Sequence, residues 1–565
     1  RREDKAVWWE YYRLRDMKDE GMLEERSALV GLKHEGHVRM AKKSPVERYS
    51  FPKQETEIRR GDKLCHGELS IGTVERIDVG ERAIEIKRTV KTAATHPTSV
   101  FVDGRGPKWE VLAESIFELG ERVSEGEVRA GRAAAWDLLL KNKPRLAEGE
   151  TIAAIGAETT VETACRIGSA LAGSVFAIQG PPGAGKTFTA ARMICRLVKE
   201  GKRTGVTAHS HKAIGKLLQE VQVAADEAEI EVQCVRKVGE EAREDEIRGV
   251  EVTGDNALPL ARIGSKAAQV AAGTAWMWAR PEYAGAVDAL FIDEGGQMAL
   301  ADVVAAARAA TNLVLVGDPQ QLQRPLKGSH PEGAEKSALE HLIGDRKTIL
   351  PEMGMLLPQT RRMHPDVCRF TSEVFYEDKL KSHPVTRPFV LEGHAQFKEP
   401  GLYFVPVSHQ GNQNSSSEEV ETVARIVQSL LKPKVKWFYG EANRRSLKRE
   451  EDILVVAPYN AQVSDLAERL PGMKIGTVDK FQGQEAPVVI YSMTTSSPEE
   501  TPRGMEFLYS LNRLNVATSR AMTAVIVVGN PRPFEPECRS PRQMQLANAL
   551  CRYRELAVTV DEAEL

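Results

Sequence analysis

The residues of this chain that could do chemistry begin with the segment Gly-Pro-Pro-Gly-Ala-Gly-Lys-Thr at positions 180–187. Its pattern, G-x-x-x-x-G-K-[S/T], is that of a loop that binds nucleotide phosphates. The glycines let successive backbone N–H groups turn toward one anion. Lys186 adds a positive charge near the β- and γ-phosphates, and the Thr187 hydroxyl is suited to Mg2+. The residues that we expect to contact the nucleotide here are Gly180, Pro181, Pro182, Gly183, Ala184, Gly185, Lys186, Thr187 and Phe188.

The elements that must position this segment are visible on both sides of it. Residues 174–179 form an apolar run typical of a buried strand, and residues 188–197 have the apolar spacing of a helix. A helix that starts at the loop presents the positive end of its dipole to the phosphates. A chance match would lack these flanks, so we predict a strand, a phosphate loop and a helix.

Two more predicted strands end in polar residues. The apolar run 287–292 is followed by Asp293 and Glu294, and the run 312–317 by a polar loop that contains Gln321. In a parallel sheet, nucleotides bind at the edge formed by the carboxyl ends of the strands. There Asp293 can hold Mg2+, directly or through water, and Glu294 can orient and deprotonate an attacking water. We expect Gln321 to sense the γ-phosphate.

Composition sets the broad class. The 565 residues are 42% hydrophobic and 28% charged, which is typical of a globular protein, and the length predicts three to five domains. The formal net charge is only -3, so a nucleic-acid partner would need a local basic surface. No apolar run approaches the length that spans a membrane, and the chain begins at Arg1 without the core of a signal peptide. We therefore expect no membrane partner.

The cysteines are scattered and form no C-x-x-C pair. This spacing disfavours a disulfide framework, a zinc ribbon and an iron–sulfur cluster, and it favours a reducing, cytoplasmic location. The seven positions are 65, 165, 195, 234, 368, 538 and 551.

The N-terminal part differs in pattern from the rest. Residues 6–30 place aromatic and leucine side chains at helical spacing, and we expect their aromatic cluster to pack, with base stacking as the alternative. From 35 to 122, short alternating strands predict a small β-barrel, with a hairpin of 71–78 and 82–88. Residues 123–145 return to helix and end in a basic run, for which phosphate contact and a solvated face both remain open.

After the phosphate loop, strands and helices alternate, which predicts a parallel sheet covered on both faces. The acidic, alanine-rich stretch 220–261 predicts a helical insertion. From residue 347 the alternation begins again, with strands expected at 401–407, 452–458, 487–491 and 523–529. This second core has no phosphate loop, so one nucleotide site must serve two cores.

Six segments together resemble the motifs of superfamily 1 helicases in order and spacing. The last three resemble the branch typified by the nonsense-mediated-decay RNA helicase (Upf1-like), the 1B class that moves 5′ to 3′. The resemblance covers about residues 150–530. The six segments are 180–187, 293–297, 317–322, 362–365, 476–485 and 513–521.

The fold that the resemblance implies is α/β, with two tandem RecA-like domains after a helical stalk and a small β-barrel. The N-terminal region also resembles bacterial relatives in which a RecB-like nuclease precedes the helicase, so an upstream nuclease is an expectation for a longer chain. The expected domains are a stalk segment at 1–34, a barrel at 35–122, a stalk helix at 123–150, a first RecA-like domain at 151–345, a second at 346–535 and a helical tail at 536–565.

The resemblance also implies a site that binds ATP and Mg2+ between two cores. Arginines from the second core then stabilise the transition state only when the cores close. The implied catalytic residues are Lys186, Asp293, Glu294, Gln321, Arg362 and Arg520, and the implied metal ligands are Thr187 and Asp293. Arg361, Gly483 and Glu485 are expected to contact the nucleotide as well.

We expect hydroxyls and loop amides to bind the phosphates of the nucleic acid. Because such contacts do not read the bases, little sequence specificity is expected. The residues that the resemblance assigns to the strand are Ser210, His211, Thr274, Pro458, Tyr459, Gln462, Thr477 and Asp479.

The chain departs from the family pattern at three places. The glutamine segment that recognises adenine is not recognisable within 148–172. Arg361 stands where an aromatic residue usually precedes Arg-Met-His-Pro, and a guanidinium can also stack on a base. Gly295 replaces the usual alanine at some cost in helix preference. The first two changes put strict adenine preference in question.

These observations favour a monomeric, ATP-dependent helicase or translocase that moves on single-stranded DNA or RNA. The alternative is a nucleotide-switched clamp that binds nucleic acid without processive movement. A ring-forming ATPase is disfavoured, because the second core supplies its arginines from the same chain.

Overall fold

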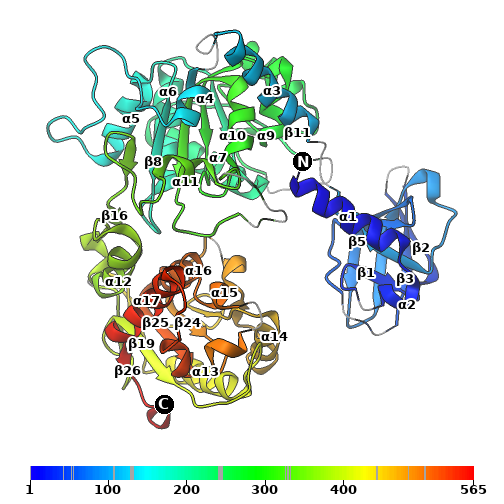
Figure 1. The fold of residues 1–565 in the computed structure, drawn as a ribbon, viewed down its shortest axis with the longest axis vertical. Helices are drawn as coiled ribbons and strands as arrows, with labels where there is room; N and C mark the ends of the chain where they lie inside the picture. The colour runs from blue at the N-terminus through cyan, green and yellow to red at the C-terminus, as the bar shows by residue number, and fades with distance from the viewer. Residues whose placement is uncertain are drawn as a thin grey trace. The chain divides into compact units, whose positions relative to one another are not determined.

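The computed structural model describes the chain except at positions 1, 24, 42–43, 53, 55, 106–108, 128–132, 240–245, 325, 327–329, 331–332, 441–442, 482 and 502–503. Contacts divide it into an N-terminal unit, mainly Arg1–Ala113, and a main unit made of Glu114–Val238, Asp245–Arg324 and Lys336–Leu565. Figure 1 traces the chain from the blue N-terminal unit through the green first core to the yellow-to-red second core of the main unit.

The N-terminal unit is a curled antiparallel sheet in the order β1-β7-β4-β5-β6-β3-β2. Alternate side chains such as Leu64, Ile84 and Val100 are buried and form its core. The predicted hairpin is confirmed, with Asp78 paired to Ala83. The elements are α1 (Arg2–Asp16), α2 (Asp19–Met22), β1 (Ala28–Val30), β2 (Lys33–Ala41), β3 (Ser44–Ser50), β4 (Lys63–His66), β5 (Leu69–Asp78), β6 (Ala83–Arg88) and β7 (Ser99–Val102).

The first core of the main unit is built on a parallel sheet in the order β11-β10-β12-β9-β13-β14-β8-β15. Its central strands are apolar runs because helices cover them, as β8 shows by being buried along its whole length. Side chains of α5, α6 and α7 pack together on one face of this sheet.

The helices that accompany the first core are α3 (Glu110–Ser124), α4 (Ala133–Leu140), α5 (Thr160–Ala170), α6 (Lys186–Lys199), α7 (His211–Glu227), α8 (Leu258–Gly264), α9 (Ala275–Trp278), α10 (Leu300–Ala306) and α11 (Ala338–Ile343). Its strands are β8 (Val175–Gln179), β9 (Thr204–Thr207), β10 (Cys234–Lys237), β11 (Val250–Thr253), β12 (Val270–Ala272), β13 (Val287–Ile292), β14 (Ala310–Gly317) and β15 (Gly354–Leu356).

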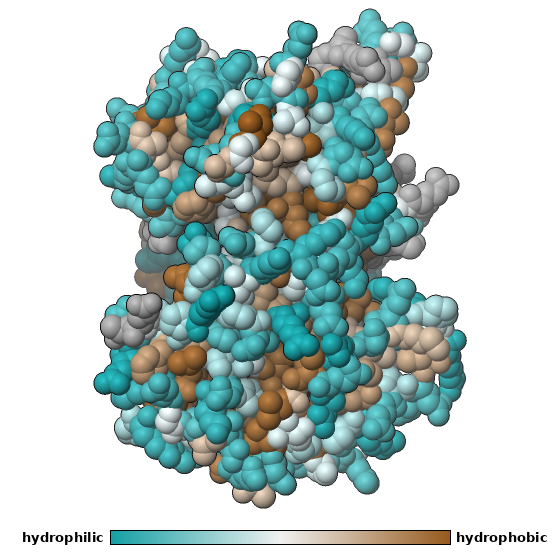
Figure 2. All heavy atoms as spheres, turned by 90° about the vertical axis from the view of Figure 1, so that its left-hand side faces the viewer, coloured by the Kyte–Doolittle hydropathy of each residue, from teal (hydrophilic) through white to brown (hydrophobic). Residues whose placement is uncertain are grey.

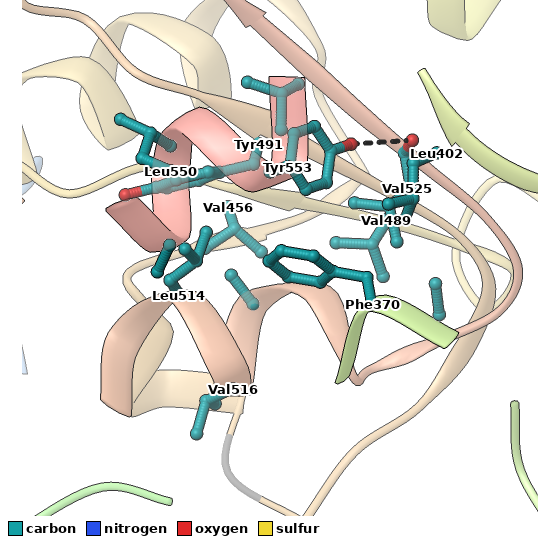
Figure 3. Packing of buried hydrophobic residues seen from close by; sticks show 14 of the residues in the cluster. Phe370, Leu402, Val456, Val489, Tyr491, Leu514, Val516, Val525, Leu550 and Tyr553 are labelled. Atoms are coloured by element: carbon teal, nitrogen blue, oxygen red, sulfur yellow. Dashed lines mark hydrogen bonds between the residues drawn. The ribbon is translucent and has the colours of Figure 1, made fainter. Parts of the chain in front are cut away.

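The second core is a parallel sheet in the order β23-β22-β24-β25-β19-β26. Along β24, Val489 and Tyr491 pack with α12, α16 and α17, whereas Val488 and Ile490 pack with α13 and α14. This alternation is what a strand covered on both faces requires. Figure 3 shows the first of these two clusters, in which Phe370, Leu514 and Tyr553 come together over the strands.

The strands of the second core are β19 (Gly401–Pro406), β22 (Ile453–Val456), β23 (Lys474–Gly476), β24 (Ala486–Ser492), β25 (Ala521–Gly529) and β26 (Val558–Thr559). Smaller sheets contain β16 (Gln359–Thr360), β17 (Lys381–Ser382), β18 (Val390–Glu392), β20 (Lys436–Phe438) and β21 (Arg444–Ser446). The helices are α12 (Pro365–Tyr376), α13 (Ser417–Leu430), α14 (Asn460–Arg469), α15 (Met505–Leu508), α16 (Leu511–Thr518) and α17 (Pro541–Leu556).

The two tandem α/β cores confirm the predicted fold class, but local predictions differ from the structure in one stretch. The helical insertion expected at 220–261 is wrong, because that stretch contributes β10 and β11 to the parallel sheet. Its alanine and glutamate content favours helix, but short valine-containing runs gain more by extending a sheet edge.

Element boundaries also differ from the expected domain boundaries. The first sheet continues past residue 345, since β15 pairs with β8. The C-terminal stretch is not only helical, since β26 pairs with β19. In the N-terminal unit the sheet starts at Ala28, ahead of the expected barrel start.

Candidate nucleotide site and nucleic-acid interface

The order of strands in the first sheet brings the predicted nucleotide residues to one edge. β14 lies between β8 and β13, and the three strands run parallel. Their carboxyl ends carry the phosphate loop, the Asp293–Glu294 pair and the loop that contains Gln321. The structure therefore gathers residues from 180 to 321 at the edge where a parallel sheet binds nucleotides.

The phosphate loop has the backbone that its sequence predicts. Gly183 and Gly185 have φ of +71° and +84°, and Gly185 caps the N-terminus of α6. A Cβ added at Gly180 would lie 2.1 Å from Cγ of Lys186, so only glycine leaves room for that side chain. The Lys186 ammonium donates to the Gly180 carbonyl at 2.6 Å. Burial lowers the pKa of Lys186, against the opposing effect of Asp318 and Glu294.

The carboxylates at the end of β13 form a crowded pair, in which Asp293 is buried and Glu294 is partly buried. Burial, together with the charge of the neighbouring Glu294, raises the pKa of Asp293 to about 7. The Glu294 backbone N–H donates to Asp293 Oδ1 at 2.9 Å, and Glu294 has a φ of +52°. Holding two carboxylates this close together costs free energy unless a cation neutralises them. Their oxygens are the ligands that Mg2+ prefers. The residues present therefore fit a magnesium ion.

Gln321 is linked to another buried carboxylate. Its Nε2 donates to Oδ2 of Asp318 at 2.8 Å. Asp318 is 3% exposed, and burial raises its pKa, while Lys186 and the groups that donate to it lower it. Asp318 follows β14 directly, in the same segment as Gln321, but its sequence position alone does not indicate a buried carboxylate.

The segment before α12 lies against the phosphate loop. The Arg361 backbone N–H donates to the Gly183 carbonyl at 2.9 Å. A Cβ at Gly183 would lie 2.5 Å from Cβ of Arg362. The Arg362 guanidinium donates to Oε2 of Glu485 at 2.5 Å and to the Ser519 carbonyl at 3.3 Å. Arg362 thus links the phosphate loop to two segments of the second core.

Arg520 lies close to the same place. It is 3% exposed, and its Nη1 donates to the Gln484 carbonyl at 3.0 Å. Among the described residues its Nε has no hydrogen-bond partner. Burial, together with the charge of Arg362, lowers the pKa of Arg520 to about 9. A buried guanidinium with an unpaired nitrogen beside this site is suited to an anion such as a phosphate.

The residues expected near the base are more exposed. Phe188 is 44% exposed, and the Arg192 guanidinium lies 3.1 Å from its ring centroid. The side chain of Arg361 is exposed, and Gly483, with a φ of +79°, has open space where a Cβ would be. Residues 148–172 contain no asparagine or glutamine, and Arg166 engages the carboxylates of Glu150 and Glu158 there.

Comparisons with known proteins agree with this geometry. Two family models, each described as an AAA domain, match residues 166–331 and 334–532. The chain is 25% identical over 411 residues to the regulator of nonsense transcripts 1 homolog of Drosophila melanogaster, covering 63% of this chain and 33% of that protein. It is 29% identical over 259 residues to the helicase sen1 of Schizosaccharomyces pombe, covering 43% of this chain and 14% of that protein. In both cores, this chain is similar to Upf1-like superfamily 1 helicases.

The chain spans about a third or less of the length of the curated relatives it matches. Among solved structures, it is similar to the arterivirus nonstructural protein 10 helicase, with a TM-score of 0.41, 14% identity and coverage of 94% of this chain and 81% of that one. Among the described residues, no helix combines the length and apolar character that crossing a bilayer requires.

The residues expected to contact single-stranded nucleic acid fall at two sheet edges. In the first core, Ser210 is exposed and caps α7, accepting from the Ala213 N–H at 3.2 Å, and His211 is the first residue of that helix. Thr274 precedes α9, and its side chain makes no capping bond. Because β9 pairs with β12, the loops that carry these residues leave neighbouring strands at one edge.

In the second core, the residues expected to contact nucleic acid differ in exposure. Thr477 and Asp479 follow β23, and Asp479 is paired with Arg513 at 3.0 Å. Pro458 is buried, and the Tyr459 ring packs 5.5 Å from Phe507.

Gln462 lies in the interior of the second core. Its Oε1 accepts from the Ser416 N–H at 2.8 Å, and its Nε2 donates to Ser492 Oγ at 2.8 Å. The side chain is fully buried, so in this structure the Gln462 amide ties α14 to the N-terminus of α13 and to the end of β24, and it is not on the surface.

Proposed function

We propose that this protein hydrolyses ATP at the site between its two α/β cores and uses the reaction to move along single-stranded nucleic acid and unwind it. The observation that carries the proposal is that the segment containing Arg361 and Arg362 is bonded to the phosphate loop at Gly183. Arg520 lies in the same charged cluster. Closure of the two cores around a nucleotide requires arginines of the second core beside the phosphate loop of the first core.

Each group has a role that its chemistry allows. Lys186 and the backbone N–H groups of the loop bind the β- and γ-phosphates. Thr187 and Asp293 would hold Mg2+, which when bound neutralises charge on the phosphate oxygens. Glu294 orients the attacking water and accepts its proton. Arg362 and Arg520 stabilise the negative charge that spreads over the transferred phosphoryl group in the transition state.

Hydrolysis is coupled to movement because the arginines and the phosphate loop belong to different cores. While a γ-phosphate is present, both cores bind the same anion, and its loss removes that shared contact. If each core holds the strand by its own phosphate contacts, alternating closure and opening moves the protein along the strand. The exposed Ser210 and the Thr274 and Thr477 hydroxyls support such contacts, which read no bases. We infer movement from 5′ to 3′ from the branch that the chain resembles.

The first test is ATP hydrolysis with single-stranded DNA, with single-stranded RNA and with neither. We expect turnover to be stimulated by a strand, and the stimulation to fall steeply with salt because phosphate contacts release counterions. Glu294→Gln should bind ATP and lose turnover by a factor of about 10² or more. Glu555→Gln, an exposed glutamate on α17, is the matched control and should behave as the wild type. Normal turnover in Glu294→Gln would refute the assignment.

A second test separates movement from clamping. Duplexes with a 5′ or a 3′ single-stranded overhang are mixed with protein and ATP, and strand displacement is followed. We expect displacement with the 5′ overhang only. Stimulated hydrolysis without displacement of either duplex would instead identify a nucleotide-switched clamp.

A further inference from the structure

The loop that contains Gln321 belongs to the first core by sequence, but the second core holds it. Asp318 to Leu322 directly follow β14. Leu322 is 7% exposed and lies in the hydrophobic cluster of the second core, together with Met363 and Val367. Burial of an apolar side chain in the opposite core anchors the loop there.

Two asparagines of α16 bind the backbone of this loop. Asn512 Nδ2 donates to the Pro319 carbonyl at 2.8 Å and also to the Gln321 carbonyl. Asn515 Nδ2 donates to the Gln320 carbonyl at 2.8 Å. Asparagines three residues apart share one face of a helix, so α16 presents both amides to three consecutive carbonyls.

Tyr376, the last residue of α12, completes the contact. Its hydroxyl donates to Asp318 Oδ2 at 2.6 Å and accepts from Asn515 Nδ2 at 3.0 Å. Both Tyr376 and Asp318 are buried, so this chain of hydrogen bonds is shielded from water. Asp318 Oδ2 also accepts from the Gln321 side chain. The expected γ-phosphate sensor and the two second-core helices therefore meet at one carboxylate.

The two helices that hold the loop also adjoin the segments that contain the arginines. α12 starts at Pro365, shortly after Arg362, and α16 ends at Thr518, shortly before Arg520. Both helices pack on the same face of the second sheet (Figure 3). If the loop moves, the hydrogen bonds from Asn512, Asn515 and Tyr376 are kept only when α12 and α16 move with it. Movement of these helices also moves the arginines next to them.

We propose that Tyr376, Asn512 and Asn515 are positioning residues that couple the Gln321 loop to Arg362 and Arg520. Through them, the state of the γ-phosphate at Gln321 sets the position of the two arginines. The inference rests on the proposed ATP hydrolysis at this site and adds residues that never touch the nucleotide.

The test compares Tyr376→Phe and Asn515→Leu with Tyr553→Phe. Tyr553 is an equally buried tyrosine of the second core, and its hydroxyl bonds the Tyr403 and Val525 carbonyls and does not touch the loop. We expect Tyr376→Phe and Asn515→Leu to lower kcat for ATP about tenfold, with KM changed less than about twofold, because the lost bonds act in positioning and not in binding. Tyr553→Phe should keep the wild-type kcat, although we expect its thermal stability to be comparable to that of the two test variants.

The second readout is hydrogen exchange of residues 318–322 and α16, with and without a non-hydrolysable ATP analogue. In the wild type, we expect the analogue to protect both segments together, and in Tyr376→Phe to protect the loop alone. Joint protection in the variant, or an equal loss of kcat in Tyr553→Phe, would overturn the coupling. Because exchange needs no turnover, it tests the coupling even if the wild type proves not to hydrolyse ATP, which would refute the proposed function alone.

Discussion

At the scale of single residues, the phosphate loop depends on positions where a side chain has no room. Gly183 combines a φ of +71° with the close approach of Thr360 and Arg362, 2.6 and 2.5 Å from where a Cβ would be. Gly295, beside the carboxylate pair, differs from Gly183 in having room for a side chain. Its nearest neighbours would lie 3.4 Å from a Cβ, which is ordinary contact. The two glycines therefore have different reasons to be there.

Gly183→Ala should lower ATP turnover by a factor of ten or more. The added methyl group must displace Arg362 and also strains a left-handed backbone conformation. Gly295→Ala is the matched control and should retain turnover, since the site accepts a Cβ. Steady-state kinetics on both variants, with circular dichroism to verify folding, checks this. Equal activity of the two would show that the loop tolerates the shift.

A second residue-scale prediction concerns His394, whose ring is neutral. Its Nδ1 accepts backbone N–H groups of Gln396 and Phe397 at 3.1 and 3.0 Å, and its Nε2 lies 2.9 Å from Ser429 Oγ. Ser429 donates its own proton to the Ile426 carbonyl, so Nε2 carries the hydrogen. Burial, with Lys432 and Lys434, lowers the pKa of His394 to about 4.

Because the folded pKa lies below the ordinary value of about 6.5, the unfolded chain takes up the proton first. The stabilising contribution is fully present above pH 6.5 and is lost as the pH falls toward 4. For a half-buried ring we expect a loss of about 1–2 kcal/mol. Urea unfolding between pH 7 and 4 should show this loss in the wild type and a smaller one in His394→Gln. The same slope in both would place the acid sensitivity elsewhere.

At the scale of elements, the carboxyl end of β24 is held by one buried carboxylate. Glu419 of α13 accepts the Thr494 backbone N–H at 2.8 Å and the Ser492 hydroxyl at 2.5 Å, and contacts His409 at 3.0 Å. Thr494 has a φ of +75°, which is unusual for a β-branched residue. The turn after β24 is therefore kept in a strained conformation by α13.

Glu419→Ala should destabilise the second core by about 3–5 kcal/mol, since it leaves buried donors without an acceptor. Glu421→Ala is the matched control on the same helix. Its carboxylate is exposed and pairs with Arg469 at the surface, so we expect a change below about 1 kcal/mol. Denaturant unfolding of the two variants measures the difference. A loss in Glu419→Ala no larger than in Glu421→Ala would contradict the role of this carboxylate.

At the scale of the whole molecule, every residue of the nucleotide site lies in the main unit. The N-terminal sheet has a core of its own, formed by side chains such as Leu64 and Ile84. In the main unit, α3 is tied to the first core, where the Ser115 hydroxyl donates to the Ala305 carbonyl at 2.8 Å. The nucleotide site can therefore be separated from the N-terminal sheet just before α3.

The face shown in Figure 2 is mainly hydrophilic, with hydrophobic residues in scattered patches.

A chain that lacks residues 1–104 should still bind a nucleoside triphosphate within about threefold of the full-length affinity, a difference of under 1 kcal/mol. Fluorescence titration with a labelled ATP analogue measures this. A truncated chain that folds, as judged by a cooperative thermal transition, but binds no analogue would mean that the N-terminal unit contributes to the site.

Patterns local in the sequence predicted much of the nucleotide site. The phosphate loop, Asp293 and Glu294 are each placed by a strand that ends and a turn that follows, and such features depend on neighbouring residues. The same locality explains the failure at 220–261, where helix-favouring residues join a sheet edge that only distant strands provide. Gln462 likewise has the type and position of a surface contact, yet its partners come from segments far away in the chain.

By itself, the sequence predicted the two-core architecture, the resemblance to superfamily 1 helicases and the residues expected to bind the phosphates, because these predictions rest on glycine, charge and strand periodicity. Only the tertiary structure decided that the loop of Gln321 is held by α12 and α16 of the other core. Tyr376, Asn512 and Asn515 carry no signal of this in their own neighbourhoods, since a hydrogen bond between residues up to 195 positions apart exists only once the chain is folded.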